Sequence, residues 1–195
     1  MRDIIFATNN KHKLQEVKQL ISDDIHIISL AEIGLSGDIP ETSETLQGNA
    51  LQKAEWVYHK TGLDCFADDT GLEVDALNGA PGVYSARYAG EGCSFADNVN
   101  KLLAAMEGKT NRKARFRTVI CLLEGGNPRY FEGSVEGVIL TEPWGTEGFG
   151  YDPIFMPDRF AVSFAEMPLD VKNKISHRGH AVSQLTAYLT NTDKR

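Results

Sequence analysis

The 195-residue chain contains few cysteines, and Cys65, Cys93 and Cys121 do not follow the spacing of a metal-binding motif. Two of the three lie in apolar, strand-like runs, which favours buried free thiols. The chain also lacks an apolar run of the ~20 residues that a membrane helix requires. The N-terminal residues Met1-Arg2-Asp3 are followed directly by a short strand-like run rather than by the long apolar region of a signal peptide. These absences predict a cytoplasmic protein that does not associate with membranes.

Positive charge is also scarce, since 20 Lys and Arg residues stand against 27 Asp and Glu residues and give a formal net charge of −7. Binding to nucleic-acid phosphates requires clustered Lys and Arg, so we expect no nucleic-acid partner. A small anionic ligand is still compatible with this charge, because the local charge around a site decides its affinity. The 42% hydrophobic and 24% charged fractions are those of an ordinary globular protein. The length suits one sizeable core, and we expect a single domain over residues 1–195.

Two adjacent acids, Asp68 and Asp69, follow a short apolar, strand-like run over residues 63–67. We expect Thr70-Gly71 to turn the chain into a second strand over residues 72–76. Successive side chains of a strand point to opposite faces, so only one of the two acids is expected to be the working group. Acids at a strand end are suitable oxygen ligands for Mg²⁺. A solvated acidic turn is the alternative, and it is the commoner explanation of an isolated pair of acids.

The polar segment Thr8-Asn9-Asn10-Lys11-His12-Lys13 joins a short apolar strand over residues 4–7 to an amphipathic helix. The expected apolar face carries Leu14, Val17, Leu20 and Ile21, and the expected polar face carries Gln15, Glu16, Lys18 and Gln19. The N-terminus of a helix offers free N–H groups and the positive end of the helix dipole, which suit a phosphate. The segment is not a Walker A loop, because the glycines and the Gly-Lys-Ser/Thr run are absent. The alternative is that Thr or Asn merely caps the helix.

Two further helices and a run of strands are expected in the middle of the chain. Glu41 precedes a helix that starts near residues 42–44 and ends at Gly62, and this acid is either a metal ligand or a solvated residue next to the helix dipole. A capping arrangement at Ser94 opens a helix that stops at Gly108. Residues 116–140 alternate as a β-meander, with strands over 129–136 and 137–140. We assign no chemistry to the meander.

The last quarter of the chain holds a glycine- and aromatic-rich loop and a late basic pair. The glycines around Phe149 and Tyr151 permit close backbone approach, and the rings offer a surface on which a base can stack. The alternative is a tight hairpin whose aromatic residues fill the edge of a core. Ser176 is expected to cap a helix whose first turn carries His177 and Arg178. Cations are unfavourable there unless an anion or an electron-rich base lies against them, although solvated basic residues are the common alternative.

Taken together and in this order, these blocks resemble the inosine triphosphate pyrophosphatase family over nearly the whole chain. The resemblance is carried by Thr8-Asn9-Asn10-Lys11-His12-Lys13, Asp68-Asp69-Thr70-Gly71-Leu72, Gly79-Ala80-Pro81-Gly82, Ser85-Ala86-Arg87, Gly148-Phe149-Gly150-Tyr151-Asp152-Pro153 and Ser176-His177-Arg178. One small departure is Thr70, where many relatives carry Ser. The resemblance implies an α/β fold with a long mixed β-sheet flanked by helices, two lobes with a central active-site cleft, and a homodimer.

The resemblance also implies an activity and a set of site residues. The family hydrolyses the non-standard purine nucleotides dITP, ITP and XTP to the monophosphate and pyrophosphate, which prevents their incorporation into DNA and RNA. It implies Asp69 as the catalytic residue, with Glu41 and Asp69 as ligands of Mg²⁺. The implied substrate-binding residues are Thr8, Asn9, Asn10, Lys11, His12, Lys13, Thr70, Phe149, Gly150, Tyr151, Asp152, Lys172, His177 and Arg178.

Three rival functions are weighed against this enzyme. A non-enzymatic nucleotide sensor would bind ITP without releasing pyrophosphate. A pyrophosphatase of related fold would act mainly on modified pyrimidine nucleotides. An interaction protein with an acidic surface would bind no nucleotide at all. A pyrophosphate-release assay over several nucleotides, with and without magnesium, together with a measurement of ITP binding, separates the four.

Overall fold

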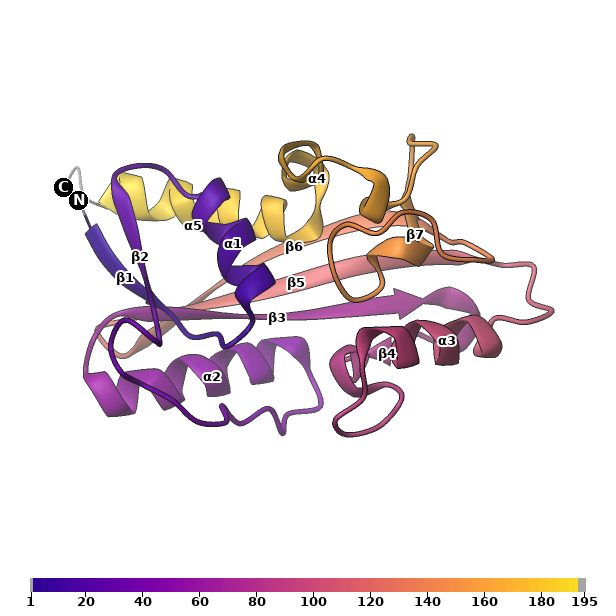
Figure 1. Ribbon diagram of the computed structural model, residues 1–195. Helices are drawn as coiled ribbons and strands as arrows, with labels where there is room; N and C mark the ends of the chain where they lie inside the picture. Colours follow the sequence, from indigo (N-terminus) through magenta and orange to yellow (C-terminus); the bar gives the residue numbers. More distant parts are fainter. Residues whose placement is uncertain (1, 193–195) are drawn as a thin grey trace. The chain divides into compact units, whose positions relative to one another are not determined.

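The computed structural model describes residues 2–192, which form a mixed β-sheet with helices packed on it (Figure 1). The strands are β1 (Arg2–Phe6), β2 (Ile25–Ser29), β3 (Cys65–Val74), β4 (Pro81–Gly82), β5 (Lys113–Glu124), β6 (Asn127–Ile139) and β7 (Phe155–Pro157). The helices are α1 (Lys11–Leu20), α2 (Leu46–Thr61), α3 (Phe95–Ala105), α4 (Leu169–Ile175) and α5 (His177–Thr192). Short 3₁₀ turns are η1 (Asp75–Leu77), η2 (Ser85–Arg87), η3 (Asp152–Ile154) and η4 (Phe164–Glu166).

The sheet has the strand order β2-β1-β3-β5-β6-β7, and β4 pairs with β3 outside this path. The strand β1 runs parallel to both β2 and β3, whereas β4 is antiparallel to β3 and β7 is antiparallel to β6. The predicted α/β fold with a long mixed sheet flanked by helices is therefore confirmed. Among the described residues, no helix combines the length and the apolar character needed to cross a membrane.

The chain divides into two compact units. The first unit comprises the described residues within Met1–Asp69, Thr118–Gly133 and Arg178–Arg195, and the second comprises Thr70–Arg117 and Ser134–His177. The strands β3, β5 and β6 contribute residues to both units. The expectation of a single domain stays a prediction.

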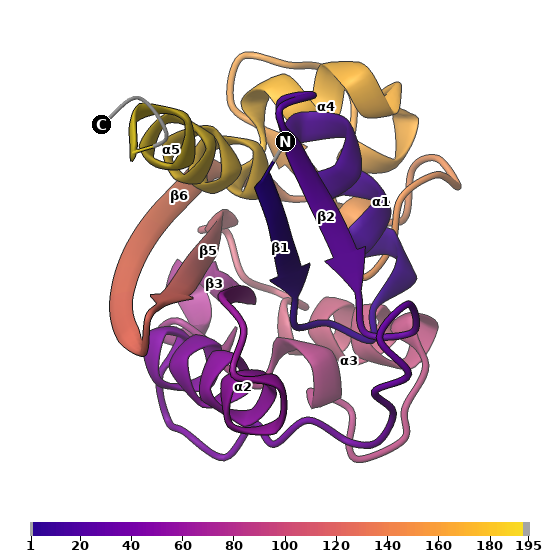
Figure 2. The same ribbon diagram turned by 90° about the vertical axis from the view of Figure 1, so that its left-hand side faces the viewer.

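The first unit has a core on each face of its strands, because consecutive strand residues point to opposite faces. In β1, Ile4 and Phe6 belong to one buried cluster and Ile5 to the other. The first cluster includes residues of α1 and α5, and the second includes residues of α2. Figures 1 and 2 accordingly show α1 and α5 on one face of these strands and α2 on the other. The three helices thus fix the polar side chains that lie between them and the sheet.

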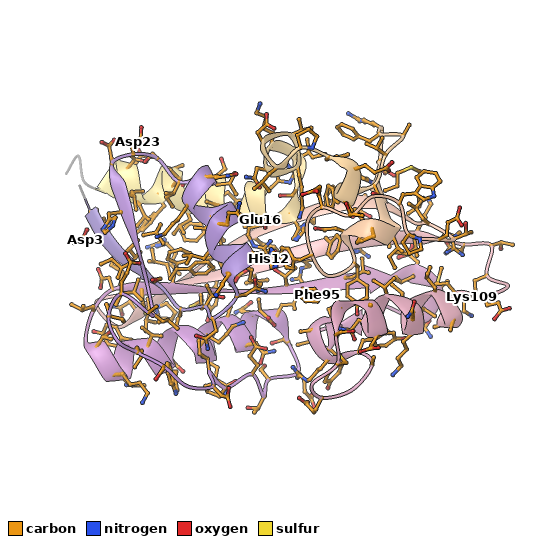
Figure 3. The ribbon with its side chains drawn as sticks, in the orientation of Figure 1. Asp3, His12, Glu16, Asp23, Phe95 and Lys109 are labelled. Atoms are coloured by element: carbon orange, nitrogen blue, oxygen red, sulfur yellow. The ribbon has the colours of Figure 1, made fainter. Side chains whose placement is uncertain are left out.

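The second unit is built around one cluster of buried residues. Its members come from β3, α3, β5, β6, η3, β7 and η4, and they are Leu72, Val74, Val99, Leu102, Met106, Ala114, Phe116, Ile139, Tyr151, Ile154, Phe155, Phe164 and Met167. Helix α3, whose first residue Phe95 is labelled in Figure 3, begins with the predicted capping arrangement. Ser94 accepts the N–H of Asp97, and the Asp97 carboxylate accepts the N–H of Ser94.

Two interruptions of strands that the sequence predicts are wrong: a turn at Thr70-Gly71 and a division at residue 137. Thr70-Gly71 does not turn the chain, since β3 runs without a break from Cys65 to Val74 and the two acids lie in its middle rather than at a strand end. A Cβ atom on Gly71 would lie 2.6 Å from the carbonyl oxygen of Gly82 in β4, so this glycine permits the close approach of a neighbouring strand. The division expected at residue 137 has the same explanation, because β6 is continuous and a Cβ on Gly137 would lie 2.4 Å from the Met156 oxygen in β7.

Candidate functional site

The two central acids are both buried, with 2% of Asp68 and 7% of Asp69 exposed, so the alternative of a solvated acidic turn is wrong. Their side chains have different partners, as the alternation along β3 requires. The Asp68 carboxylate contacts Lys13 and Arg178, whereas the Asp69 carboxylate contacts Lys53 and Asn49. All of these residues belong to the first unit.

Asp68 joins the first helix to the last one through two cations. Lys13 Nζ of α1 donates to Asp68 Oδ1 at 3.1 Å, and Arg178 of α5 donates from Nε and Nη2 to Asp68 Oδ2, each at 3.2 Å. Arg178 also donates from Nη1 to the carboxylate of Glu16, which Figure 3 labels on α1. The Arg178 side chain is 1% exposed, so its guanidinium is held between two carboxylates inside the protein.

These pairings set the protonation states of the group. Burial would raise the pKa of Asp68, but the charges of Lys13 and Arg178 outweigh it and hold this pKa well below its usual range. Burial lowers the pKa of Lys13, against the opposing effect of Asp68. Burial also acts to lower the pKa of Arg178, but Glu16 and Asp68 raise it overall. Asp68 and Arg178 are therefore charged at neutral pH.

Asp69 forms the second group. Its Oδ1 accepts a hydrogen bond from Lys53 Nζ at 3.2 Å and its Oδ2 accepts one from Asn49 Nδ2 at 3.1 Å. Lys53 also donates to the carboxylate of Glu41, so one ammonium joins both predicted metal ligands. Burial raises the pKa of Asp69. Burial acts against the charged form of Lys53, but Asp69 and Glu41 together raise its pKa. A carboxylate with a raised pKa beside a cation is typical of a functional site.

The two groups together carry one more negative than positive formal charge. The acids are Glu16, Glu41, Asp68 and Asp69, and the cations are Lys13, Lys53 and Arg178. The cluster therefore has no net positive charge with which to attract a polyphosphate. A divalent cation would correct this imbalance.

Glu41 and Asp69 fit Mg²⁺ as a partial ligand set. Mg²⁺ is commonly held by one or two carboxylates, with water and substrate phosphates completing an octahedron. Among residues 2–192, no group of three or more His, Cys, Asp and Glu side chains is arranged to hold a metal ion. The two carboxylates that share Lys53 are thus too few for a closed structural metal site. They suit a site whose metal ion binds together with a phosphate.

The N-terminus of α1 shows that Asn10 is a helix cap. Its side-chain oxygen accepts the N–H groups of His12 and Lys13 at 3.0 and 3.1 Å, and Thr8 Oγ1 accepts the N–H of Asn10 at 3.1 Å. The capping alternative is confirmed for Asn10, which leaves its amide nitrogen as the side-chain group that can face a ligand.

The neighbouring polar residues point elsewhere. Asn9 Nδ2 donates to the Gly37 oxygen at 3.0 Å, so this side chain holds the loop after β2. Lys11 and His12 are exposed on the first turn of α1. Lys13, in the same turn, reaches the buried acids, since its Nζ donates to Asp68.

The predicted residues of the second unit form a separate group around Asp152. Its Oδ2 accepts the N–H of Phe149 at 2.9 Å and a hydrogen bond from Lys172 Nζ at 2.7 Å. The Lys172 ammonium also lies 5.2 Å from the centre of the Phe149 ring, a cation–π contact. A Cβ atom on Gly148, where φ is +74°, would lie 2.1 Å from Asp152 Oδ2. The glycine therefore lets the loop close on the carboxylate, and Gly150 also has a positive φ of +63°.

Tyr151 and His177 are core residues of the second unit. Tyr151 is 4% exposed and its hydroxyl donates to the Ser85 oxygen at 2.8 Å, which matches the alternative that an aromatic residue of this loop fills a core. Burial raises the pKa of its hydroxyl. The His177 ring stacks on Phe116 with centroids 4.6 Å apart. Thr70 is half-buried in β3, with its side chain partly open to solvent.

Three polar residues of the site were missed from the sequence: Glu16, Asn49 and Lys53. Glu16 was expected on the solvated face of α1, which is wrong, because it is 4% exposed and pairs with Arg178. Lys53 lies three residues after Ala50 and four before Val57, on the apolar stripe of α2. A charged residue at such a position is the signal that could have revealed it, since a buried cation needs a buried acid.

The fold and the site together define an α/β protein in which buried carboxylates, each paired with a cation, lie beside a helix N-terminus, an arrangement that suits phosphate and a hard metal ion. Residues 4–188 match the Ham1 family, and the chain belongs to this family.

Curated relatives extend the match over nearly the whole chain. The chain is 54% identical over 189 residues to a dITP/XTP pyrophosphatase of Flavobacterium johnsoniae, covering 97% of this chain and 98% of the relative. It is 55% identical over 190 residues to a dITP/XTP pyrophosphatase of Porphyromonas gingivalis, with the same coverage of 97% and 98%. A solved structure of a HAM1 protein from Coxiella burnetii has a TM-score of 0.90 at 42% identity and covers 98% of this chain and 100% of that one. The resemblance stated from the sequence is thereby confirmed.

Proposed function

We propose that this chain is a nucleoside triphosphate pyrophosphohydrolase that converts non-standard purine nucleotides (dITP, ITP and XTP) to the monophosphate and pyrophosphate. Membership of the Ham1 family and the names of the relatives support this proposal. The observation that carries it is the buried Asp69 carboxylate, which is oriented by Asn49 and Lys53 and shares Lys53 with Glu41. Removal of such nucleotides from the cell's pool would keep them out of DNA and RNA.

Magnesium is part of the proposal. Glu41 and Asp69 would hold Mg²⁺, which would neutralise phosphate oxygens and lower the pKa of a bound water. Asp69 is the base assigned to the proton of the attacking water. Water attack at the α-phosphorus would release pyrophosphate. Lys13 and the Asn10 amide nitrogen, at the N-terminus of α1, are assigned to the phosphates.

Discrimination among bases must come from residues that face the base, because all nucleoside triphosphates share the same phosphates. Phe149 offers the stacking ring, and its Lys172 neighbour is assigned as a donor to the base. The family resemblance adds His177 and Arg178 to the substrate-binding residues. Hypoxanthine and xanthine carry an oxygen acceptor at position 6, where adenine carries an amino donor. A buried donor left unpaired by adenine can discriminate by roughly 10⁴. We therefore expect ITP and XTP to be preferred over ATP.

The test is a pyrophosphate-release assay on ITP, XTP, GTP, ATP and dUTP with the wild type and the Asp69→Asn variant. We expect the variant to remain folded by circular dichroism and to lose at least about 10³-fold in kcat, because it lacks both the base and a metal ligand. Asp23→Asn, at an exposed acid, is the matched control and should retain full activity.

The same assay tests the rival functions. Wild-type-like turnover by Asp69→Asn would remove Asp69 from the mechanism. Tight ITP binding without pyrophosphate release would identify a nucleotide sensor, and a preference for dUTP would identify a pyrimidine enzyme. Binding to none of the five nucleotides would overturn the enzyme proposal altogether.

We also propose that the protein is a homodimer, as the family resemblance implies, and that it acts in the cytoplasm, as the sequence predicts. Light scattering on the purified protein should give twice the chain mass of 21.5 kDa. A mass of one chain at micromolar concentration would contradict the dimer. Fractionation of the source cells would test the location.

A further inference from the structure

Lys53 lies where a metal ion would be expected. Its ammonium contacts Asp69 Oδ1 at 3.2 Å and the Glu41 carboxylate, and these are the two carboxylates assigned to Mg²⁺. The residue is 5% exposed, so its charge depends on these acids rather than on water. One buried positive charge is thus shared between two carboxylates in the free protein, and it balances only one of their two negative charges.

A divalent cation and this ammonium compete for the same oxygen atoms. Two like charges within a few ångströms of each other repel strongly in a poorly solvated environment. A metal bound by both carboxylates would therefore require the ammonium to leave at least one of them. Lysine can do so, because its charge is carried on a flexible four-carbon stem with three rotatable donors.

We propose that Lys53 is an exchangeable counter-ion of the metal site: it pairs with Glu41 and Asp69 in the free protein and gives up these carboxylates when a divalent cation binds. This inference rests on the metal site of the proposed function. The displaced ammonium becomes available to a phosphate oxygen, whose negative charge arrives together with the metal. The exchange keeps Glu41 and Asp69 paired with a cation both before and after the ligand binds.

A permanent structural bridge is the competing role for Lys53, and the two roles predict opposite effects on metal affinity. If Lys53 only holds the two acids in place, its removal should disorder them and weaken metal binding. If Lys53 competes with the metal, its removal should strengthen metal binding, because the repulsion and the lost ion pairs no longer oppose it. The affinity of the free protein for a metal distinguishes these roles without any measurement of catalysis.

The experiment is a titration of nucleotide-free protein with Mn²⁺, followed by electron paramagnetic resonance and calorimetry. Lys53→Met removes the charge and keeps the length of the side chain, and we expect it to bind Mn²⁺ at least about tenfold more tightly than the wild type. Lys53→Arg keeps the charge and should bind like the wild type. Lys60→Met, at an exposed position on the same helix, is the matched control and should also bind like the wild type.

The outcomes separate the two proposals. Mn²⁺ binding by Lys53→Met that is equal to or weaker than that of the wild type overturns the counter-ion role and leaves the metal site intact. Failure of every variant to bind Mn²⁺ at millimolar concentration, both without and with inorganic pyrophosphate, overturns the metal site and the counter-ion role together. Pyrophosphate release that depends on Mg²⁺ is measured separately, so a failure of the counter-ion role does not count against the enzyme.

A second measurement on the wild type keeps the inference testable if Lys53→Met does not fold. The ammonium groups of lysines held in ion pairs can be followed by ¹⁵N NMR, and Lys53→Arg identifies the signal of Lys53. Addition of Mg²⁺ should shift or broaden this signal and leave that of Lys60 unchanged. A Lys53 signal that does not change at saturating Mg²⁺ would contradict the exchange.

Discussion

Single buried charges in this protein are held by more than one partner. Asp68 accepts hydrogen bonds from Lys13 and Arg178, and Arg178 is also held by Glu16. Removal of one member of such a group leaves its partners buried without full compensation. We therefore expect Asp68→Asn to lower the free energy of unfolding by about 3 kcal/mol, measured by urea denaturation.

The control for this prediction is Asp3→Asn, at an acid whose pairing with His26 is exposed on both sides. Exposed ion pairs contribute little to stability, so this variant should unfold almost as the wild type does. If both variants had the same small effect, the Asp68 group would not stabilise the fold, and its four charges would have to be retained for another reason.

The cysteines give a prediction about pH. Burial raises the pKa of both the Cys65 and the Cys121 thiols from 9.0 to about 12. The folded protein therefore keeps these two protons at pH values where the unfolded chain loses them. The stability that results is fully present below pH 9 and decreases as the pH rises from 9 towards 12.

Two measurements check this prediction. The free energy of unfolding should be flat between pH 7.5 and 8.5 and should fall above about pH 9. At pH 8, iodoacetamide should modify the partly exposed Cys93 in the folded protein, and Cys65 and Cys121 only after denaturation. Rapid modification of all three thiols in the native state would show that the strands around Cys65 open readily.

At the scale of the element, α1 depends on its cap. The Asn10 side chain satisfies two N–H groups at the N-terminus of the helix, so we expect Asn10→Ala to cost about 1 kcal/mol of stability and Asn10→Asp to keep most of it. Asn9→Ala is the matched control, because Asn9 lies one residue earlier and binds the Gly37 oxygen instead. Thermal unfolding of the three variants is the measurement. Equal losses for Asn9→Ala and Asn10→Ala would contradict a special role of the cap.

The elements show what local sequence can predict. The Ser94 capping arrangement, the glycine that ends α2 and the position of His177 at the start of α5 follow from residues within a few positions of one another, and all three are confirmed. The turn expected at Gly71 is wrong, because the partner that requires a glycine there is the backbone of Gly82, eleven residues away. Helix α4 was not predicted. A glycine in a strand-like run marks either a turn or the close approach of another backbone, and the sequence near it cannot decide between the two.

The same reasoning applies to the candidate site. The resemblance assigned Glu41, Asp69 and Arg178, but the residues that hold them in place were not found from the sequence. Arg178 is separated by 162 positions from Glu16, and Asp69 is separated by 16 from Lys53. Such pairs depend on the packing of α1, α2 and α5 against the strands, which short-range patterns do not contain. The family resemblance thus assigned roles to the site residues, and the structure shows which contacts hold these residues in place.

At the scale of the whole molecule, the charge argues for a divalent cation. The chain has a formal net charge of −7, and the acids around Asp68 and Asp69 outnumber their cations by one. A nucleoside triphosphate is itself highly negative, so neither the chain nor this cluster offers net attraction to the free nucleotide. We therefore expect turnover of ITP to follow the concentration of the magnesium complex rather than that of total ITP. Initial rates at fixed ITP and varied Mg²⁺ measure this dependence.

Removal of the metal should abolish the reaction without unfolding the protein. Glu41 and Asp69 are both paired with Lys53 in the free protein, so a chelator should leave the thermal unfolding midpoint almost unchanged while pyrophosphate release stops. Excess Mg²⁺ should restore full activity, whereas excess K⁺ at equal ionic strength should not, because a monovalent ion cannot supply the same charge to two carboxylates. Turnover that continues at its full rate in chelator would exclude the metal, and the positive charge would then have to come from Lys13, Lys53 and Arg178 alone.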